Sequence, residues 1–292
     1  MKKKMLVFVV ALFALTISCN KDETKEENVL TQDEIATSTK IDNVADDISK
    51  IVEEQFNFDF GISNRGTSES SNLLPDCATV TRDPAIGETL TVGQIITKTI
   101  DFGTSGCLFP LTGAVLKGKI IITMPYQPQS NVHTATYTFV DFYHNNRKVV
   151  GTKTFVRTYT PATPITSPTL VVVMNMDLTI TLQDSRVITR TGSRTRELVE
   201  GLNTPLIFVD NVYKITGEWF TTFPNESVKT STITSPLFLK IACAPQNSIF
   251  AKGIITFSRN NNTATLDYGD GACDNVAVFT KNGIATTITL GN

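Results

Sequence analysis

The sequence has few of the residues from which many catalytic sites are built. It contains two histidines, His133 and His144. Neither belongs to a nucleophile elbow or to a His-Glu-x-x-His pair, the motifs of α/β-hydrolases and of zinc proteases. Glutamates such as Glu197 and Glu218 would suit a glycosidase acid pair, but their spacing in the sequence does not fix the distance between them. We therefore expect a protein that is not an enzyme and that needs no cofactor.

Basic residues are also too few for a nucleic-acid binder. The chain has 26 Lys and Arg against 28 Asp and Glu. Residues 20–76 hold 14 acids and 5 bases, whereas residues 77–292 hold 14 acids and 18 bases. A surplus of four positive charges over so long a region is small, so we expect no nucleic-acid partner. The acidic part is interpreted as a tether and the weakly basic part as the folded domain.

The longest apolar run stands at the N-terminus. Three lysines at positions 2–4 precede apolar residues 5–15, and small residues lead to Cys19. This run of about eleven residues is too short to span a membrane as a final helix. The pattern predicts a lipoprotein signal peptide at residues 1–18 and lipidation, such as palmitate, at Cys19. The alternative is a secreted protein cut after Ser18.

The segment after this cysteine resembles a known export signal. Residues 19–23 read Cys-Asn-Lys-Asp-Glu, and a lysine with acids after the cysteine is similar to the signal of surface lipoproteins of Bacteroidota. Thr16 stands where such signals usually have leucine. Asp-Phe-Gly at 101–103 and Asp-Tyr-Gly-Asp-Gly-Ala-Cys-Asp at 267–274 also resemble segments of β-rich lipoproteins of that group. The resemblance implies a lipid-anchored outer-membrane protein, exposed on the cell surface, and supplies no chemistry.

Four further cysteines suit an exported protein with two disulfides. Cys77 and Cys107 are 30 residues apart, and so are Cys243 and Cys273. A hairpin centred near residues 259–262 would bring Cys243 and Cys273 to its open end, within bridging distance. Among the three possible connectivities we therefore favour Cys77 with Cys107 and Cys243 with Cys273.

The equal spacing also indicates an internal repeat, residues 77–124 and 243–290. In both copies Asp, an aromatic residue and Gly stand six, five and four positions before the second cysteine, and residues 118–123 then align with 283–288. Asp267, Asp270 and Asp274 would offer carboxylates to Ca²⁺. Because only Asp267 has an equivalent, Asp101, the shared motif is interpreted as a turn, and we expect no metal site.

From residue 77 onward the sequence is rich in Thr, Val and Ile with a period of two. Residues 170–182 alternate between an apolar face and a largely polar face, which is typical of a strand with one side on a core. Turn residues at 145–146, 184–185, 224–225 and 282–283 separate such segments. This pattern predicts an all-β domain at 77–292. About 10–12 antiparallel strands would form a meander, as a sandwich or a strongly curved, barrel-like sheet.

One amphipathic helix is expected before the β domain, at residues 31–57. Thr31 and Glu34 form a capping-box pattern, and apolar residues recur at three- and four-residue steps. Residues 19–30 are interpreted as the lipidated cysteine with an acidic spacer, and 58–76 as a flexible linker. The apolar stripe would dock on the β domain or on a partner, and we favour the β domain.

A strip of arginines is the candidate ligand site. On an extended strand four of them share one face, and the register of a turn at 184–185 places that face on the polar side, near Asp177 and Asn175. Such guanidinium groups suit carboxylates or sulfates of an anionic glycan, and a solvated strand face is the alternative. The four residues are Arg186, Arg190, Arg194 and Arg196. Trp219 and Tyr213 would stack on a sugar, although a core role is the stronger interpretation.

These observations predict a non-enzymatic, surface-exposed outer-membrane lipoprotein that acts as a binding or structural module. Its partners would be the membrane, through the lipid anchor, and either an anionic glycan or a surface protein. The alternative is a glycan-directed binder or hydrolase in the same compartment.

Overall fold

A computed structural model describes residues 30–59, 73–204, 207–246 and 250–290 of the chain. The predicted signal peptide at 1–18, the lipidation site Cys19 and most of the predicted linker lie outside the described residues.

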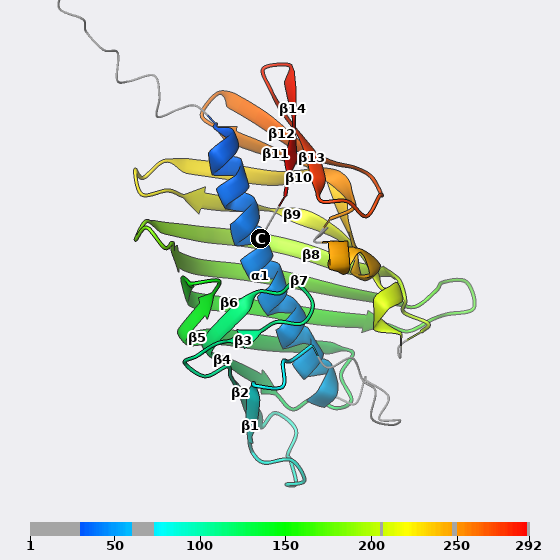
Figure 1. Ribbon diagram of the computed structural model, residues 1–292. Coiled ribbons are helices and arrows are strands. Elements are labelled where there is room, and N and C mark those ends of the chain that lie inside the picture. Colours follow the sequence, from blue (N-terminus) through cyan, green and yellow to red (C-terminus); the bar gives the residue numbers. More distant parts are fainter. Residues whose placement is uncertain (1–29, 60–72, 205–206, 247–249, 291–292) are drawn as a thin grey trace, which may run out of the picture.

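The strands form one antiparallel sheet (Figure 1). Its path runs from β1 to β14 in chain order, with β3 paired to β4 beside that path. The all-β prediction is confirmed. The described residues form 14 strands, more than the expected 10–12. These strands make a single open sheet instead of a sandwich. The strands are β1 (Thr79–Asp83), β2 (Ile95–Asp101), β3 (Cys107–Leu108), β4 (Val115–Pro125), β5 (Val132–His144), β6 (Arg147–Thr160), β7 (Thr169–Thr181), β8 (Val187–Glu200), β9 (Val212–Thr222), β10 (Val228–Lys240), β11 (Lys252–Arg259), β12 (Asn262–Asp270), β13 (Val276–Lys281) and β14 (Ile284–Thr289).

Short turns of the expected chemistry connect many neighbouring strands. Asn145 and Asn146 between β5 and β6 both have positive φ, as does Asn282 between β13 and β14. Asparagine adopts this left-handed conformation more readily than most residues, which is why it suits tight hairpins. The chain therefore turns where the sequence predicted, at each of these hairpins.

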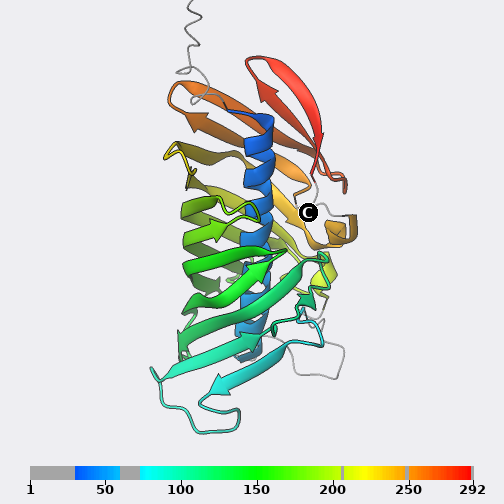
Figure 2. The same ribbon diagram turned by 60° about the vertical axis from the view of Figure 1, so that its left-hand side comes forward.

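A long helix, α1 (Gln32–Asp59), lies against one face of the sheet and crosses the strands (Figures 1 and 2). We call this the inner face. The capping box forms: Glu34 N donates to Thr31 Oγ1 at 3.2 Å, and Thr31 N donates to Glu34 Oε2 at 3.3 Å. Residues 41–52 are all buried, so docking within the chain is confirmed. Two 3₁₀ helices, η2 (Phe208–Asp210) and η3 (Ile241–Gln246), complete the described secondary structure.

The apolar core is divided into two clusters along α1. Ile41, Ile48 and Phe56 of the helix pack in the cluster formed mainly by β2–β8. Leu30 and Ile35, at the start of the helix, belong to the second cluster, formed by β9–β14. Among the described residues, no helix combines the length and apolar character needed to cross a membrane.

Irregular pairing accompanies the curvature of the sheet. The register between β4 and β5 shifts at Lys117 and Lys119. Gly118, between them, has a φ of 78°, and a Cβ there would stand 2.0 Å from Asp141 O. Bulges of this kind bend a strand and increase its twist. Glycine is required at position 118 because the two backbones approach too closely for a side chain.

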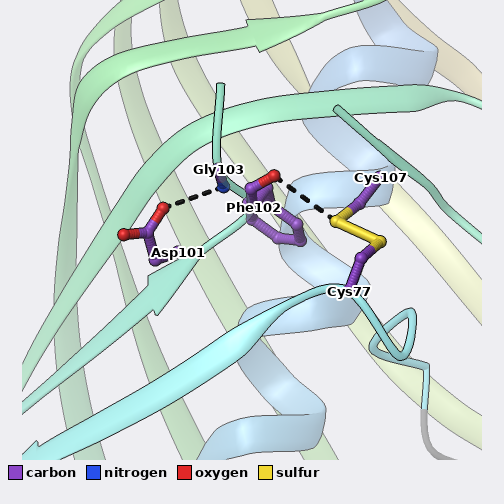
Figure 3. The surroundings of a disulfide bond; sticks show 5 residues. All are labelled: Cys77, Asp101, Phe102, Gly103 and Cys107. Carbon is purple, nitrogen blue, oxygen red and sulfur yellow. Dashed lines mark hydrogen bonds between the residues drawn. A yellow bond between two sulfur atoms is a disulfide. The ribbon is translucent and has the colours of Figure 1, made fainter. Parts of the chain in front are cut away.

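Both predicted disulfides are present, with Cα–Cα distances of 5.9 Å for Cys77–Cys107 and 4.9 Å for Cys243–Cys273. Figure 3 shows the first of them, with Cys107 Sγ 3.4 Å from the carbonyl oxygen of Phe102. In the same view Asp101 accepts a hydrogen bond of 2.9 Å from Gly103 N.

The two copies of the sequence repeat share the same local structure only in their first part. Asp267 accepts a bond of 2.9 Å from Gly269 N, the counterpart of the Asp101 bond, so the Asp-aromatic-Gly motif is a turn in both copies. After the second cysteine the aligned segments differ, because β4 pairs with β2 whereas β14 pairs with β13 and not with β12. The aligned segments 118–123 and 283–288 therefore occupy different places in the sheet.

Candidate functional site

The candidate site is the boundary between α1 and the inner face of the sheet. The helix sequence carries eight acids and two lysines, and buried basic side chains of several strands meet it. We call this boundary the ionic interface. The buried cations of the inner face include Lys98, Lys153, Arg190, Arg194, Arg196, Lys229 and Arg259.

The centre of the ionic interface is a chain of ion pairs between α1 and β8. Arg190 Nη1 donates to Asp42 Oδ1 at 2.5 Å, and Arg194 also binds Asp42. Arg194 Nη1 lies 3.2 Å from Asp46 Oδ1. Burial lowers the pKa of Arg190. Burial also acts to lower the pKa of Arg194, but Asp42 and Asp46 outweigh it and hold that pKa above its ordinary value. Both guanidinium groups are thus paired with carboxylates of the helix.

The candidate arginines are therefore not a solvent-exposed strip. Arg190, Arg194 and Arg196 are at most 3% exposed, and Arg196 forms an ion pair with Glu53 of the helix. Arg186 is set apart at the hairpin turn, where its side chain is 55% exposed and its Nε lies 2.8 Å from Asp184 Oδ2. The prediction that one polar face carries all four is wrong.

The reason is the length of the turn between β7 and β8. Leu182 N donates to Arg186 O and Ser185, with a φ of 66°, closes the loop, so three residues and not two connect the strands. Arg190 therefore stands opposite Leu178, and Arg194 opposite Met174, on the apolar face of β7. A shift of one residue moves every side chain of a strand to the other face. Asp177, the expected neighbour, pairs with Thr191 and is exposed.

The aromatic candidates support these arginines. The Arg194 guanidinium lies 3.9 Å from the centroid of Trp219, and that of Arg196 lies 4.8 Å from Tyr213. Trp219 is fully buried, which confirms its core role and excludes it as an exposed sugar platform. Stacking of a guanidinium on an aromatic face stabilises a cation that has lost its water.

Two glycines leave room for the stacked arginine and aromatic side chains. Gly192 is opposite Trp219, and Gly217 is opposite Arg194. A Cβ on Gly192 would stand 2.6 Å from the Cβ of Trp219, and one on Gly217 would stand 2.8 Å from the Cα of Arg194. Both positions also have a positive φ. The close approach of β8 and β9 therefore depends on residues without side chains.

A second polar group surrounds Asp47 of the helix. Asp47 Oδ2 lies 2.9 Å from His144 Nε2 and accepts a bond of 2.8 Å from Thr112 Oγ1, while Lys50 Nζ lies 3.5 Å from Oδ1. Burial acts to raise the pKa of Asp47, but Lys50, His144 and Thr112 lower it below its ordinary value. His144, at the end of β5, thus binds the helix. Its carboxylate partner, Asp47, lies 97 residues away in the sequence.

A third group centres on Lys153 of β6. Its Nζ donates to Ser49 Oγ at 2.7 Å and to Ala45 O at 2.9 Å, and Ser49 Oγ lies 3.4 Å from Tyr137 OH. Burial lowers the pKa of Lys153 to about 7, against the opposing effect of Asp46. A hydroxyl beside such an amine has the chemistry of a nucleophile and its base. Ser49 and Lys153 are both 2% exposed, so this pair holds α1 in place and has no open approach for a substrate.

The two ends of α1 are fixed in the same way. Near the C-terminal end, Lys98 Nζ of β2 donates to Gln55 O at 2.9 Å. Near the N-terminal end, Arg259 Nη1 of β11 lies 3.0 Å from Glu34 Oε1, and Lys281 Nζ donates to Leu30 O at 2.8 Å. Polar contacts therefore join the helix to the sheet from β2 to β13.

Sequence reasoning missed the partners on α1, chiefly Asp42, Asp46, Asp47, Ser49 and Glu53. The sequence carries a signal, because an acidic segment precedes a basic domain, but composition alone predicts a tether for that segment. The acidic helix instead packs inside the fold. Among the described residues, no group of three or more His, Cys, Asp or Glu side chains is arranged to hold a metal ion.

Comparison of the chain with protein-family models, with curated proteins and with solved structures finds no match.

Proposed function

We propose that this protein is a lipid-anchored, surface-exposed outer-membrane lipoprotein whose β domain is a structural or binding module and not an enzyme. The anchor rests on the basic residues, short apolar run and cysteine at positions 2–19, and on the resemblance of residues 19–23 to surface export signals. A multiply acylated cysteine would hold the protein at the membrane without a transmembrane helix.

One observation supports the structural role most directly. The segment nearest to the proposed anchor among the described residues, α1, is enclosed by the sheet and bound to it through Asp42, Asp46, Asp47 and Glu53. A membrane tether attached to this helix would therefore pull on the whole sheet and not on a loose arm. The polar groups of the inner face hold the chain's own helix, which is the arrangement of a scaffold.

The glycan-directed alternative loses its strongest feature. Three of its four candidate arginines, Arg190, Arg194 and Arg196, face carboxylates of α1 and are buried. A glycan would have to displace the helix to reach them. Capture of the full chain on acidic polysaccharide beads at low salt would restore this alternative, and we expect none.

The anchor is tested by labelling cells with radioactive fatty acid. The wild-type chain and Ser18→Ala, which keeps a small residue before the cysteine, should incorporate label, and Cys19→Ala should not. Protease added to whole cells should digest the wild-type protein if it is displayed on the surface. Equal labelling of Cys19→Ala and wild type would contradict the lipoprotein proposal, and protection from protease would contradict surface display.

A further inference from the structure

Five polar side chains form a row on the inner face beneath the first half of α1. Thr221 of β9 is paired with Arg190 of β8 on one side and with Lys229 of β10 on the other. Thr230 pairs with Ser258, which places Arg259 of β11 beside Lys229. Ser231, two residues along β10, shares their face. We call Arg190, Thr221, Lys229, Ser231 and Arg259 the cationic row; each is at most 4% exposed.

The cationic row contains buried donors that no described group accepts. Lys229 Nζ, Thr221 Oγ1 and Ser231 Oγ have no hydrogen-bond partner among the described residues, and neither do Nε of Arg190 nor Nε and Nη2 of Arg259. Proteins bond nearly all of their buried polar atoms, because an unbonded donor loses its water without compensation. So many free donors on four adjacent strands indicate a missing acceptor.

The charges around the row are also unbalanced. The cations are Arg190, Arg194, Lys229 and Arg259, and the facing carboxylates are Glu34, Asp42 and Asp46. Each carboxylate is already occupied: Asp42 by Arg190 and Arg194, Asp46 by Arg194, and Glu34 by Arg259. Lys153, which interacts with Asp46, adds to the positive excess only below its pKa of about 7. Burial lowers the pKa of Lys229 to about 7, so the lysine is charged below that pH. Water would supply acceptors to the hydroxyls, but it would not balance this charge, as an anion would.

We propose that the cationic row binds a small inorganic anion, a halide or a tetrahedral oxyanion, between α1 and strands β8–β11. We expect a small anion because the side chains of the row are buried and aromatic rings lie beside two of its cations. Lys229 Nζ lies 4.7 Å from the centroid of Phe257 and 5.6 Å from that of Phe223, and the Arg259 guanidinium lies 5.1 Å from the same Phe223 ring. Ammonium, guanidinium and hydroxyl groups are all donors, as an anion requires.

Thermal unfolding of the full chain in detergent tests this site. Chloride, phosphate or sulfate replaces gluconate, a bulky organic anion, at constant ionic strength and pH. The melting temperature of the wild type should rise with the concentration of at least one inorganic anion, because a ligand of the native state stabilises it by mass action. Lys229→Met replaces the ammonium with an unbranched apolar chain beside the rings of Phe223 and Phe257. This change should abolish the rise. The control Lys148→Met, at a position outside the row where the lysine side chain is 40% exposed, should keep it.

Crystals grown with bromide supply a direct measurement. An anomalous peak beside Lys229 Nζ and Ser231 Oγ, absent from Lys229→Met, would support the site. If Lys229→Met does not fold, Thr221→Val combined with Ser231→Ala removes two donors with little change of shape and should weaken the anion dependence. A melting temperature independent of all three anions, or equal anion dependence in wild type and the row variants, would overturn the proposal. None of these outcomes depends on the lipid anchor.

Discussion

Arg190 Nη1 lies 2.5 Å from Asp42 Oδ1, both side chains are buried, and 148 residues of sequence separate them. A pair of this kind is weak evidence of net stability, because taking two charges out of water offsets much of their attraction. It does fix geometry, since a shift of α1 along the sheet would separate both charges from their partners. The pair therefore sets the position of the helix.

Asp42→Asn should strongly destabilise the protein. The change keeps the shape of the side chain but leaves Arg190 and Arg194 without their shared carboxylate, and a broken buried pair typically costs about 3–5 kcal/mol. Asp33→Asn, in the exposed first turn of α1, is the matched control and should cost less than about 1 kcal/mol. Urea unfolding of both variants measures the difference. Equal losses would mean that the buried pair has no special role.

Lys153 should make stability depend on pH. Its pKa is about 7 in the folded chain and 10.5 ordinarily, so between these values the unfolded chain binds one more proton. The free energy of unfolding should therefore rise with pH in this window, by about 1.4 kcal/mol per pH unit from this residue. Below pH 7 the lysine is charged in both states and adds no slope.

The comparison of the wild type with Lys153→Met isolates this contribution. Chemical unfolding between pH 7 and 10 should give a shallower rise for Lys153→Met. Lys148→Met, which replaces a lysine whose side chain is 40% exposed, should follow the wild type. Parallel curves for wild type and Lys153→Met would show that the folded lysine does not titrate in this range.

Gly217→Ala should destabilise the contact between β8 and β9. Its Cβ would stand 2.3 Å from Ser193 O and 2.8 Å from Arg194 Cα, at a φ of 138°. Gly87→Ala, with a φ of 97° and open space around it, carries the backbone strain without the collision. We expect Gly217→Ala to lose about 1–3 kcal/mol more than Gly87→Ala. Melting temperatures that fall equally would assign the whole effect to backbone conformation.

Peptide mapping without reduction should find Cys77 joined to Cys107 and Cys243 joined to Cys273. Removal of either bridge by a double change to alanine should cost about 2–4 kcal/mol, because the unfolded chain gains freedom. A peptide joining Cys77 to Cys273 would contradict both pairings.

Local features of the fold were predictable because their causes are local. The capping box at Thr31 and Glu34 requires a spacing of three residues, and the hairpin at Asn282 requires a residue that tolerates positive φ. The period of two at residues 170–182 predicted which side of β7 is buried, and equal spacing predicted the disulfides.

The face of the arginines was not predictable from the same pattern. Their common parity was correct, but their side of the sheet depended on whether two or three residues make the turn before β8, and Asp184-Ser185 favours a turn without fixing its length. One additional residue in this turn places the arginines in the buried interface with α1 instead of on a solvated face of the sheet.

The sequence by itself determined the strands, most of their turns, the helix and the cysteine pairs, since each depends on residues close together or on simple spacing. The tertiary structure alone decided that one open sheet encloses α1 and that Asp42, Asp46, Asp47 and Glu53 meet cations of the sheet. The separation of acidic and basic residues along the chain indicated that the two regions attract each other. A buried ion pair, however, requires distances of a few ångström between particular side chains. Those distances exist only when segments separated by 97 to 152 residues in the sequence share one core.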